Sequence, residues 1–198
     1  ADLASRRLSA EALMVATLDR IAERNPAVNA VVGLADPGAL LAQARALDAG
    51  PVMGPLHGLP LAIKDLVNVQ GIRSTRGSPI FADFVPESDD VLAARLRASG
   101  AILIGKTNVP EFGLGSHTFN PVYGRTNNPY NPARTCGGSS GGAGVALALG
   151  MVALADGSDM MGSLRNPAAW SNVYGFRPSW GRVPAEPVQD RTLHKMAT

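Results

Sequence analysis

Strand-like apolar runs alternate with amphipathic helical patterns over the first 107 residues. The apolar runs that are typical of buried strands cover residues 29–34, 59–69 and 101–107. Helical spacing of apolar side chains follows three positions suited to starting a helix: Ser9, Asp36-Pro37 and Ser88. The first of these helices should end at Asn25-Pro26. Because helices that alternate with strands usually connect neighbours in one sheet, the sequence predicts an α/β architecture with a largely parallel sheet.

The second half of the chain is less regular. Residues 142–150 predict a helix of small side chains, and residues 151–159 predict one more strand. Between Gly115 and Gly138 no periodicity is visible, and a loop of this length in a compact domain is usually functional or disordered. Since no internal repeat or flexible linker divides the chain, we predict a single domain over residues 1–198.

Composition argues against several classes of protein. The 18 basic and 16 acidic residues give a net charge of +2, and no basic run indicates a nucleic-acid surface. His57, His117 and His194 lack the spacing of a metal site, so we predict no metal, and we expect His57 to bond to backbone in a turn. The single cysteine, Cys136, predicts a buried thiol and fits a reducing compartment. With no leader and no membrane-length apolar run, we expect a soluble, cytoplasmic protein.

One lysine lies inside the apolar run of residues 59–69. Charged side chains are rarely buried without a partner, and desolvation lowers the pKa of a lysine until its neutral amine can accept a proton. Lys64 is therefore a candidate general base. The alternative is an ion pair with the neighbouring Asp65 at the end of the strand.

The segment TCGGSSGGAGVALALG, residues 135–150, combines six glycines with two adjacent serines. Glycine lets backbone N–H groups approach a ligand, but no Lys-Ser or Lys-Thr follows, which argues against a phosphate-binding loop. The nucleophile pattern G-x-S-x-G fits in two frames, around Ser139 and around Ser140, and therefore discriminates little. A structural turn that leads into a helix is the alternative.

A third segment, SDMMGSLRNPAAW, covers residues 158–170. Pro167 should prevent an immediate helix, which leaves a bend where backbone N–H groups lie beside the hydroxyl of Ser163, as acyl transfer requires. Asp159 and Arg165 have the charges needed to fix this bend by a salt bridge. An ordinary surface turn is the alternative.

Together these segments resemble the amidase signature family. The blocks that carry the resemblance are, in order, GPLHGLPLAIKDLVNVQGI, GAILIGKTNVPEFG, NPYNPARTCGGSSGGAGVALALG and GSDMMGSLRNPAAWSNVYGFRPSWGRVP. The resemblance implies an α/β/α layered fold with a mixed, largely parallel central sheet flanked by helices. Family chains are longer, so we expect this sequence to be the N-terminal portion, with a sheet that is incomplete at the C-terminal end.

The resemblance also implies a Ser–Ser–Lys triad. Lys64 corresponds to the base, Ser139 to a bridging serine that follows a cis Gly138–Ser139 peptide bond, and Ser163 to the nucleophile. Ser163 would attack an amide carbonyl while its proton passes through Ser139 to neutral Lys64, and water would then hydrolyse the acyl-enzyme. Ser140 is implied as a supporting hydrogen-bonding residue, and no cofactor is implied.

The chain departs from the family pattern beside the nucleophile. Members typically have two glycines there, whose N–H groups form the oxyanion hole, whereas this chain has Met160-Met161-Gly162. We expect the N–H of Met161 to stay available and the two methionines to add an apolar wall to the substrate site. Gly113 matches a position whose backbone faces the substrate in some members.

The resemblance thus implies an amidase that converts a small carboxamide into a carboxylate plus ammonia or an amine. Its partner would be the small-molecule amide, without nucleic acid or membrane, and the chain is compatible with a homo-oligomer. The runner-up is an A-subunit-like glutaminase of an aminoacyl-tRNA amidotransferase. Two further alternatives are a catalytically impaired binding paralogue and an α/β-hydrolase with a triad of Ser140, Asp159 or Asp190, and His194.

Overall fold

The first two helices begin where the sequence predicts them. In the computed structural model, which describes residues 2–3 and 5–184, α1 (Ala10–Val28) starts after Ser9, whose hydroxyl accepts the N–H of Ala12. Asp36 caps α2 (Pro37–Ala49) in the same way. The predicted end of α1 at Pro26 is wrong, because the helix continues to Val28. Pro26 removes only one N–H donor from the helix. The N–H of Asn29 still donates to the carbonyl of Asn25 at 2.7 Å and completes the last turn.

The central sheet contains β1 (Val31–Val32), β3 (Ile102–Thr107) and β2 (Pro60–Lys64), in that order. It is mixed, as expected, with β2 parallel and β1 antiparallel to β3. The predicted strand over residues 59–69 is shorter than expected, because the carbonyl of Lys64 accepts the N–H groups of Leu66 and Val67 in a turn. Lys64 is therefore the last residue of its strand.

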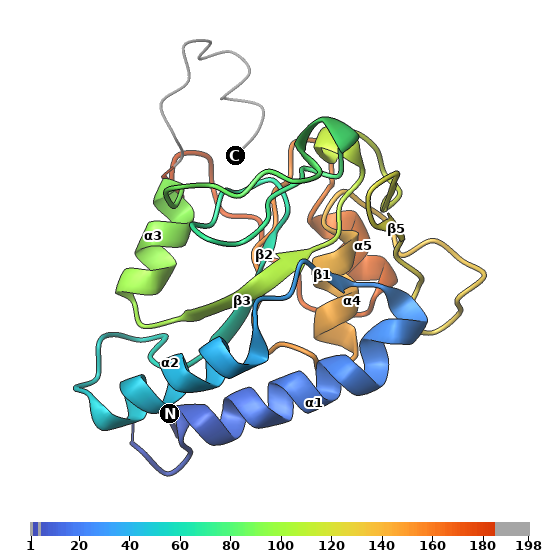
Figure 1. Ribbon diagram of the computed structural model, residues 1–198. Helices are drawn as coiled ribbons and strands as arrows, with labels where there is room; N and C mark the ends of the chain where they lie inside the picture. Colours follow the sequence, from blue (N-terminus) through green and yellow to red (C-terminus); the bar gives the residue numbers. More distant parts are fainter. Residues whose placement is uncertain (1, 4, 185–198) are drawn as a thin grey trace.

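Helices cover both faces of this sheet (Figure 1). On one face, α1, α2 and α4 (Gly141–Ala148) pack on Ala62, Ile102 and Ile104. On the other face, α3 (Val91–Ala98) and residues 67–72 pack on a second cluster that contains Leu61, Ile63 and Leu103. This arrangement agrees with the α/β expectation and places the glycine-rich segment, which leads into α4, beside the end of β2.

Two predictions for the second half are wrong. Residues 151–159 form no regular strand and pair with β2 only through a parallel bridge between Ala62 and Ala155, because the side chain of Asp156 takes the backbone N–H of Lys64. A helix, α5 (Arg165–Trp170), forms despite Pro167, because the proline lies in its first turn, where no intrahelical N–H bond is required.

The segment between Gly115 and Gly138 contains a short hairpin of β4 (Phe119–Asn120) and β5 (Gly124–Arg125). Two 3-10 turns, η1 (Pro79–Phe81) and η2 (Glu111–Gly113), complete the regular structure of the described ranges. Within these same ranges, no helix is both long and apolar enough to cross a bilayer.

Candidate active site

Lys64 ends in a cluster of three serine hydroxyls. Its Nζ donates to the Oγ atoms of Ser139 at 2.8 Å, Ser140 at 2.8 Å and Ser158 at 2.9 Å. The lysine is 1% exposed, and Ser139 and Ser140 are 2% and 3% exposed. Burial lowers the pKa of Lys64 to about 8, against the opposing influence of Asp156 and Asp159. An amine in this environment can lose a proton near neutral pH and act as a base.

The glycine-rich segment brings Ser139 and Ser140 to the lysine. The Gly138–Ser139 peptide bond is cis, as the resemblance implies. Close packing explains two of the glycines that follow: a Cβ would lie 2.1 Å from the hydroxyl of Thr118 at Gly141 and 2.3 Å from the backbone of Asn108 at Gly142. Because these two positions carry no side chain, α4 can begin directly against the sheet.

Ser163 is joined to the glycine-rich segment through its backbone. Its carbonyl accepts the N–H of Ser140 at 3.0 Å. Its hydroxyl forms no hydrogen bond with another described residue, so the expected link from Ser163 to Ser139 is absent from this structure. The two outer residues of the predicted triad thus lie beside the same segment, with a hydrogen bond between Lys64 and Ser139 and none between Ser139 and Ser163.

Asp159 fixes the bend that carries Ser163. Its carboxylate accepts the N–H of Gly162 at 2.7 Å and pairs with the guanidinium of Arg165 at 2.8 Å, as the sequence predicts. Arg177 lies 3.7 Å away on the same carboxylate. The hydrogen bond with Arg165 holds the pKa of Asp159 well below its usual range. The N–H of Gly162 is engaged, whereas those of Met160, Met161 and Ser163 form no hydrogen bond with another described residue, so the unbonded donors next to the Ser163 hydroxyl are the N–H groups of Met161 and Ser163.

The alternative partner of Lys64, Asp65, points away from it. Asp65 accepts the hydroxyl and the N–H of Thr75, and no salt bridge joins it to Lys64 in the described ranges. Successive residues of a strand face opposite sides of the sheet, so the end of β2 directs Lys64 and Asp65 to different faces. The carboxylate near Lys64 is instead Asp156, which accepts the backbone N–H of Lys64 at 2.7 Å and whose pKa is raised by burial.

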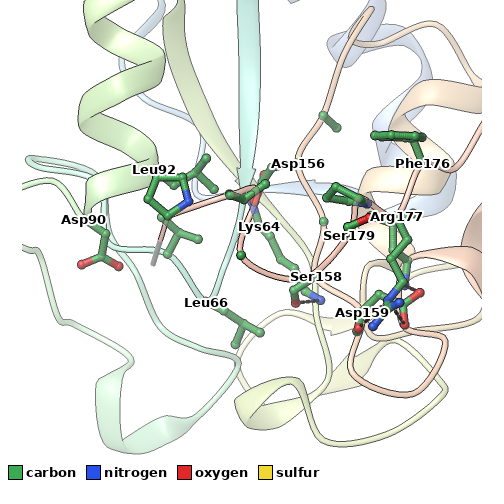
Figure 2. A pocket seen from close by; sticks show the side chains of 18 residues that line it. Lys64, Leu66, Asp90, Leu92, Asp156, Ser158, Asp159, Phe176, Arg177 and Ser179 are labelled. Carbon is green, nitrogen blue, oxygen red and sulfur yellow. Dashed lines mark hydrogen bonds and ion pairs between the residues drawn. The ribbon is translucent and has the colours of Figure 1, made fainter. Parts of the chain in front are cut away.

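A cavity of about 480 Å³ opens beside Lys64 (Figure 2). Lys64, Asp156 and Ser158 line one part of it, and Leu66, Phe176 and Arg177 line other parts. Neither Ser139 nor Ser163 lines this cavity. The cavity gives access to the lysine from the side of Ser158.

The residues expected to bind substrate do not gather around one site in this structure. Met160 and Met161 are exposed, Met161 by 82%, so the predicted apolar wall is not formed by this structure. Met161 has an ordinary negative φ, while Gly162 has a φ of +106°, so the replaced glycine position accepts a side chain without backbone strain. Gly113 packs against Leu66.

Two background predictions are confirmed, and two candidate residues lie outside the described ranges. The Nδ1 of His57 accepts the N–H of Met53, and Cys136 is buried, which raises the pKa of its thiol to about 11. Asp190 and His194, members of the alternative hydrolase triad, fall among the residues that are not described. Across the placed residues, no three side chains of Asp, Glu, His or Cys gather closely enough to hold a metal ion.

Sequence reasoning missed Ser158. Its hydroxyl contacts Lys64, and its backbone N–H reaches the Oγ of Ser140 at 3.3 Å. The sequence held one signal that could have found it: Ser158 stands five residues before Ser163, at the start of the quoted block.

A family profile described as Amidase matches residues 12–197. The chain belongs to the amidase family. Among curated relatives, the Glutamyl-tRNA(Gln) amidotransferase A-subunit of Azoarcus sp. (strain BH72) is 46% identical over 91% of this chain and 38% of its own. The protein of the same name from Saccharolobus solfataricus is 40% identical over 92% of this chain and 38% of its own.

Solved structures agree with this family assignment. A structure titled "Crystal structure of amidase" is 41% identical, with a TM-score of 0.86 over 93% of this chain and 43% of that one. A bacterial aryl acylamidase of the amidase signature family is 35% identical, with a TM-score of 0.85 over 96% of this chain and 40% of that one. The described fold is thus a fragment of the mixed α/β amidase fold, and the chain spans less than half the length of these relatives.

Proposed function

We propose that this chain carries the Ser–Ser–Lys centre of an amide hydrolase, with Lys64 as base, Ser139 as the bridging serine and Ser163 as nucleophile. The observation that carries the proposal is the 2.8 Å contact between a buried lysine amine and the hydroxyl of Ser139. Deprotonated Lys64 accepts the Ser139 proton while Ser139 takes that of Ser163, whose oxygen forms the bond to the amide carbonyl carbon. Rotation of the Ser163 hydroxyl toward Ser139 closes the open link.

The oxyanion that forms on the carbonyl would be held by the N–H groups of Met161 and Ser163, which the bend leaves unbonded. When the tetrahedral intermediate collapses, the relay returns the proton to the departing nitrogen, which leaves as ammonia or an amine. Water then adds to the acyl-enzyme and releases the carboxylate through the same relay. Ser140 and Ser158 hold the lysine in place during both steps.

Within this reaction, the substrate that we favour is a glutamine-type carboxamide, as in an A-subunit-like glutaminase. The supporting observation is that curated relatives 40–46% identical to the chain carry the name of an amidotransferase A-subunit. A small-amide hydrolase is the other candidate, and structures titled amidase and aryl acylamidase are its support. Ammonia release from L-glutamine that increases with added partner proteins would favour the first, and release from simple carboxamides without partners the second.

The nucleophile can be tested independently of the substrate. A serine-directed fluorophosphonate should add one covalent adduct to the protein, detected by intact mass, and Ser163→Ala should abolish it. Ser116→Ala, which changes a serine outside the hydroxyl cluster of Lys64, is the matched control and should leave the adduct unchanged. An adduct that persists in Ser163→Ala would assign the nucleophile to another residue and end the proposed relay.

A further inference from the structure

A second buried lysine lies behind the Lys64 site. The 18 basic residues of the chain include only three lysines, at positions 64, 106 and 195, and the third lies outside the described residues. Lys106 is 0% exposed. Its Nζ donates to the backbone carbonyl of Val67, in the turn that ends β2. The proposed mechanism makes no use of this amine.

The register of the sheet places the two lysines on opposite faces. Ile63 is opposite Lys106 and Lys64 is opposite Thr107, so each pair shares one face. Leu61 pairs with Leu103 but Ala62 pairs with Gly105, so β3 contains one extra residue, a β-bulge, at this point. Such a bulge re-aims the side chains that follow it. Lys106 consequently lies on the face covered by α3, behind the strand end that presents Lys64 to the serines.

Several carboxylates surround the two amines. The carboxylates whose charges act on Lys106 are Asp65, Asp156, Asp90 and Asp89, and those whose charges act on Lys64 are Asp156 and Asp159. Tyr123 and Arg73 complete the ionisable groups near Asp65.

Arginines balance two of these carboxylates, Asp159 through Arg165 and Asp89 through Arg97 at 2.7 Å. Asp156 has no arginine partner in the placed part of the chain, and both lysines act on its ionisation. Asp65 is held by Thr75 and faces Lys106. The negative charge of Asp156 is therefore shared between the two buried amines.

We propose that Lys106 is a positioning residue for Lys64: its positive charge offsets Asp65 and Asp156, and its bond to Val67 holds the turn that follows the base. The proposal deepens the proposed function, since it assumes that Lys64 acts as the neutral base. Val67 and Leu66 of this turn line the cavity beside Lys64, so the contact also shapes that opening. Without Lys106, the charge of Asp156 would act on Lys64 alone and favour its protonated form.

The electrostatics agree with the geometry. Burial lowers the pKa of Lys106 to about 8, and Asp65 and Asp156 oppose that shift. Two groups that share a carboxylate titrate as a coupled pair, because the protonation of one changes the field at the other. Loss of the Lys106 charge should therefore raise the pKa of Lys64, since the charge of Asp156 would then be offset by Lys64 alone.

The small number of lysines makes a direct test feasible. In a protein labelled with [13Cε]lysine, NMR should show three lysine signals, and single lysine-to-methionine variants assign them. We expect Lys106→Met to raise the pKa of the Lys64 signal by about one unit. Arg45→Met, which removes an exposed positive charge, is the control and should leave the Lys64 titration unchanged. An unchanged Lys64 titration in folded Lys106→Met would overturn the proposal.

The parent protein supplies a second measurement if Lys106→Met does not fold. Coupled amines should each titrate over a broader range than a single proton allows, with an inflection at the pKa of the other. Two simple one-proton curves would contradict the coupling. No substrate is needed, so a chain that hydrolyses no amide still decides this point. Conversely, if amide hydrolysis proceeds while the lysines titrate independently, only the role of Lys106 is lost.

Discussion

The backbone N–H of Ser140 donates to the carbonyl of Ser163 at 3.0 Å, which joins the glycine-rich segment to the bend that carries the proposed nucleophile. The contact places the two segments beside the buried amine of Lys64, although they are more than 20 residues apart in the chain. It uses main-chain atoms only, so it sets the position of Ser163 without restricting its hydroxyl. In the proposed mechanism, this hydroxyl turns toward Ser139 when a substrate binds.

The pH dependence of the reaction should follow Lys64. In the proposed relay the neutral amine is the active form, and burial lowers its pKa to about 8, so kcat/KM should rise with pH and level off above about 8. Lys64→Met should remove the activity while leaving the fold intact, since methionine fills a similar volume. A rate that is independent of pH between 6 and 9 would argue against a lysine base. The measurement is a pH series with a simple carboxamide or L-glutamine.

Loss of the Ser158 hydroxyl should lower the pKa of Lys64, whereas loss of Lys106 should raise it. Its hydroxyl accepts a hydrogen bond from the amine, and a charged donor gains more from that bond than a neutral one. Ser158→Ala should therefore shift the acid limb of the rate profile to lower pH and reduce kcat about 10-fold. Ser158→Thr keeps a hydroxyl and should restore most of the rate. If Ala and Thr variants behave alike, the contact has no role in positioning the lysine.

Asp159 should be the most sensitive residue of the bend. It is 3% exposed and accepts hydrogen bonds from three backbone N–H groups as well as from Arg165. Asp159→Asn should lower the free energy of unfolding by about 2–3 kcal/mol and reduce kcat, because the loop before Ser163 loses its anchor. Arg165→Gln should cost less, since the arginine is largely exposed. Denaturant unfolding measures the loss of stability in each variant. An equal loss in Asp159→Asn and Arg165→Gln would refute the prediction.

Close packing at the start of α4 predicts a large effect from one added methyl group. At Gly142 a Cβ would lie 2.3 Å from the backbone N of Asn108, where no flexible side chain can move aside. Gly142→Ala should destabilise the protein by about 3 kcal/mol or more. Gly38→Ala, at an exposed position in the first turn of α2, is the matched control and should stay within about 1 kcal/mol of the parent. Thermal unfolding of both variants measures the difference.

Stability itself should depend on pH in the alkaline range. Burial depresses the pKa values of Lys64 and Lys106 from 10.5 to about 8, so above pH 8 the unfolded chain binds more protons than the folded one. The free energy of unfolding should then rise with pH, by up to about 1.4 kcal/mol per pH unit for each lysine. The rise should be clearest between pH 8 and 9, because the raised pKa of Cys136 opposes it above 9. Lys106→Met should remove part of the slope.

Some features of this protein follow from local sequence alone. The starts of α1 and α2 depend on Ser9 and Asp36, whose side chains bond to nearby backbone groups. The salt bridge between Asp159 and Arg165 spans six residues, and the buried position of Lys64 follows from the apolar run around it. Each of these features is decided by interactions within a few residues or by the local hydrophobic pattern, so reading the chain is enough to predict it. The triad assignment, by contrast, depends on the family blocks, which carry long-range information that composition and spacing lack.

Other features were decided only by the tertiary structure. The helix α5 forms around Pro167 because the proline falls in a first turn, and residues 151–159 lose their strand because Asp156 replaces a backbone partner of β2. Ser158 joins Lys64 across 94 residues of chain. The face taken by Lys106 depends on a one-residue shift in the register of β3, which no local pattern of the strand reveals. These outcomes result from which distant groups meet, and the physical reason is that hydrogen-bond partners and strand register are set by packing between segments rather than by the preferences of any one of them.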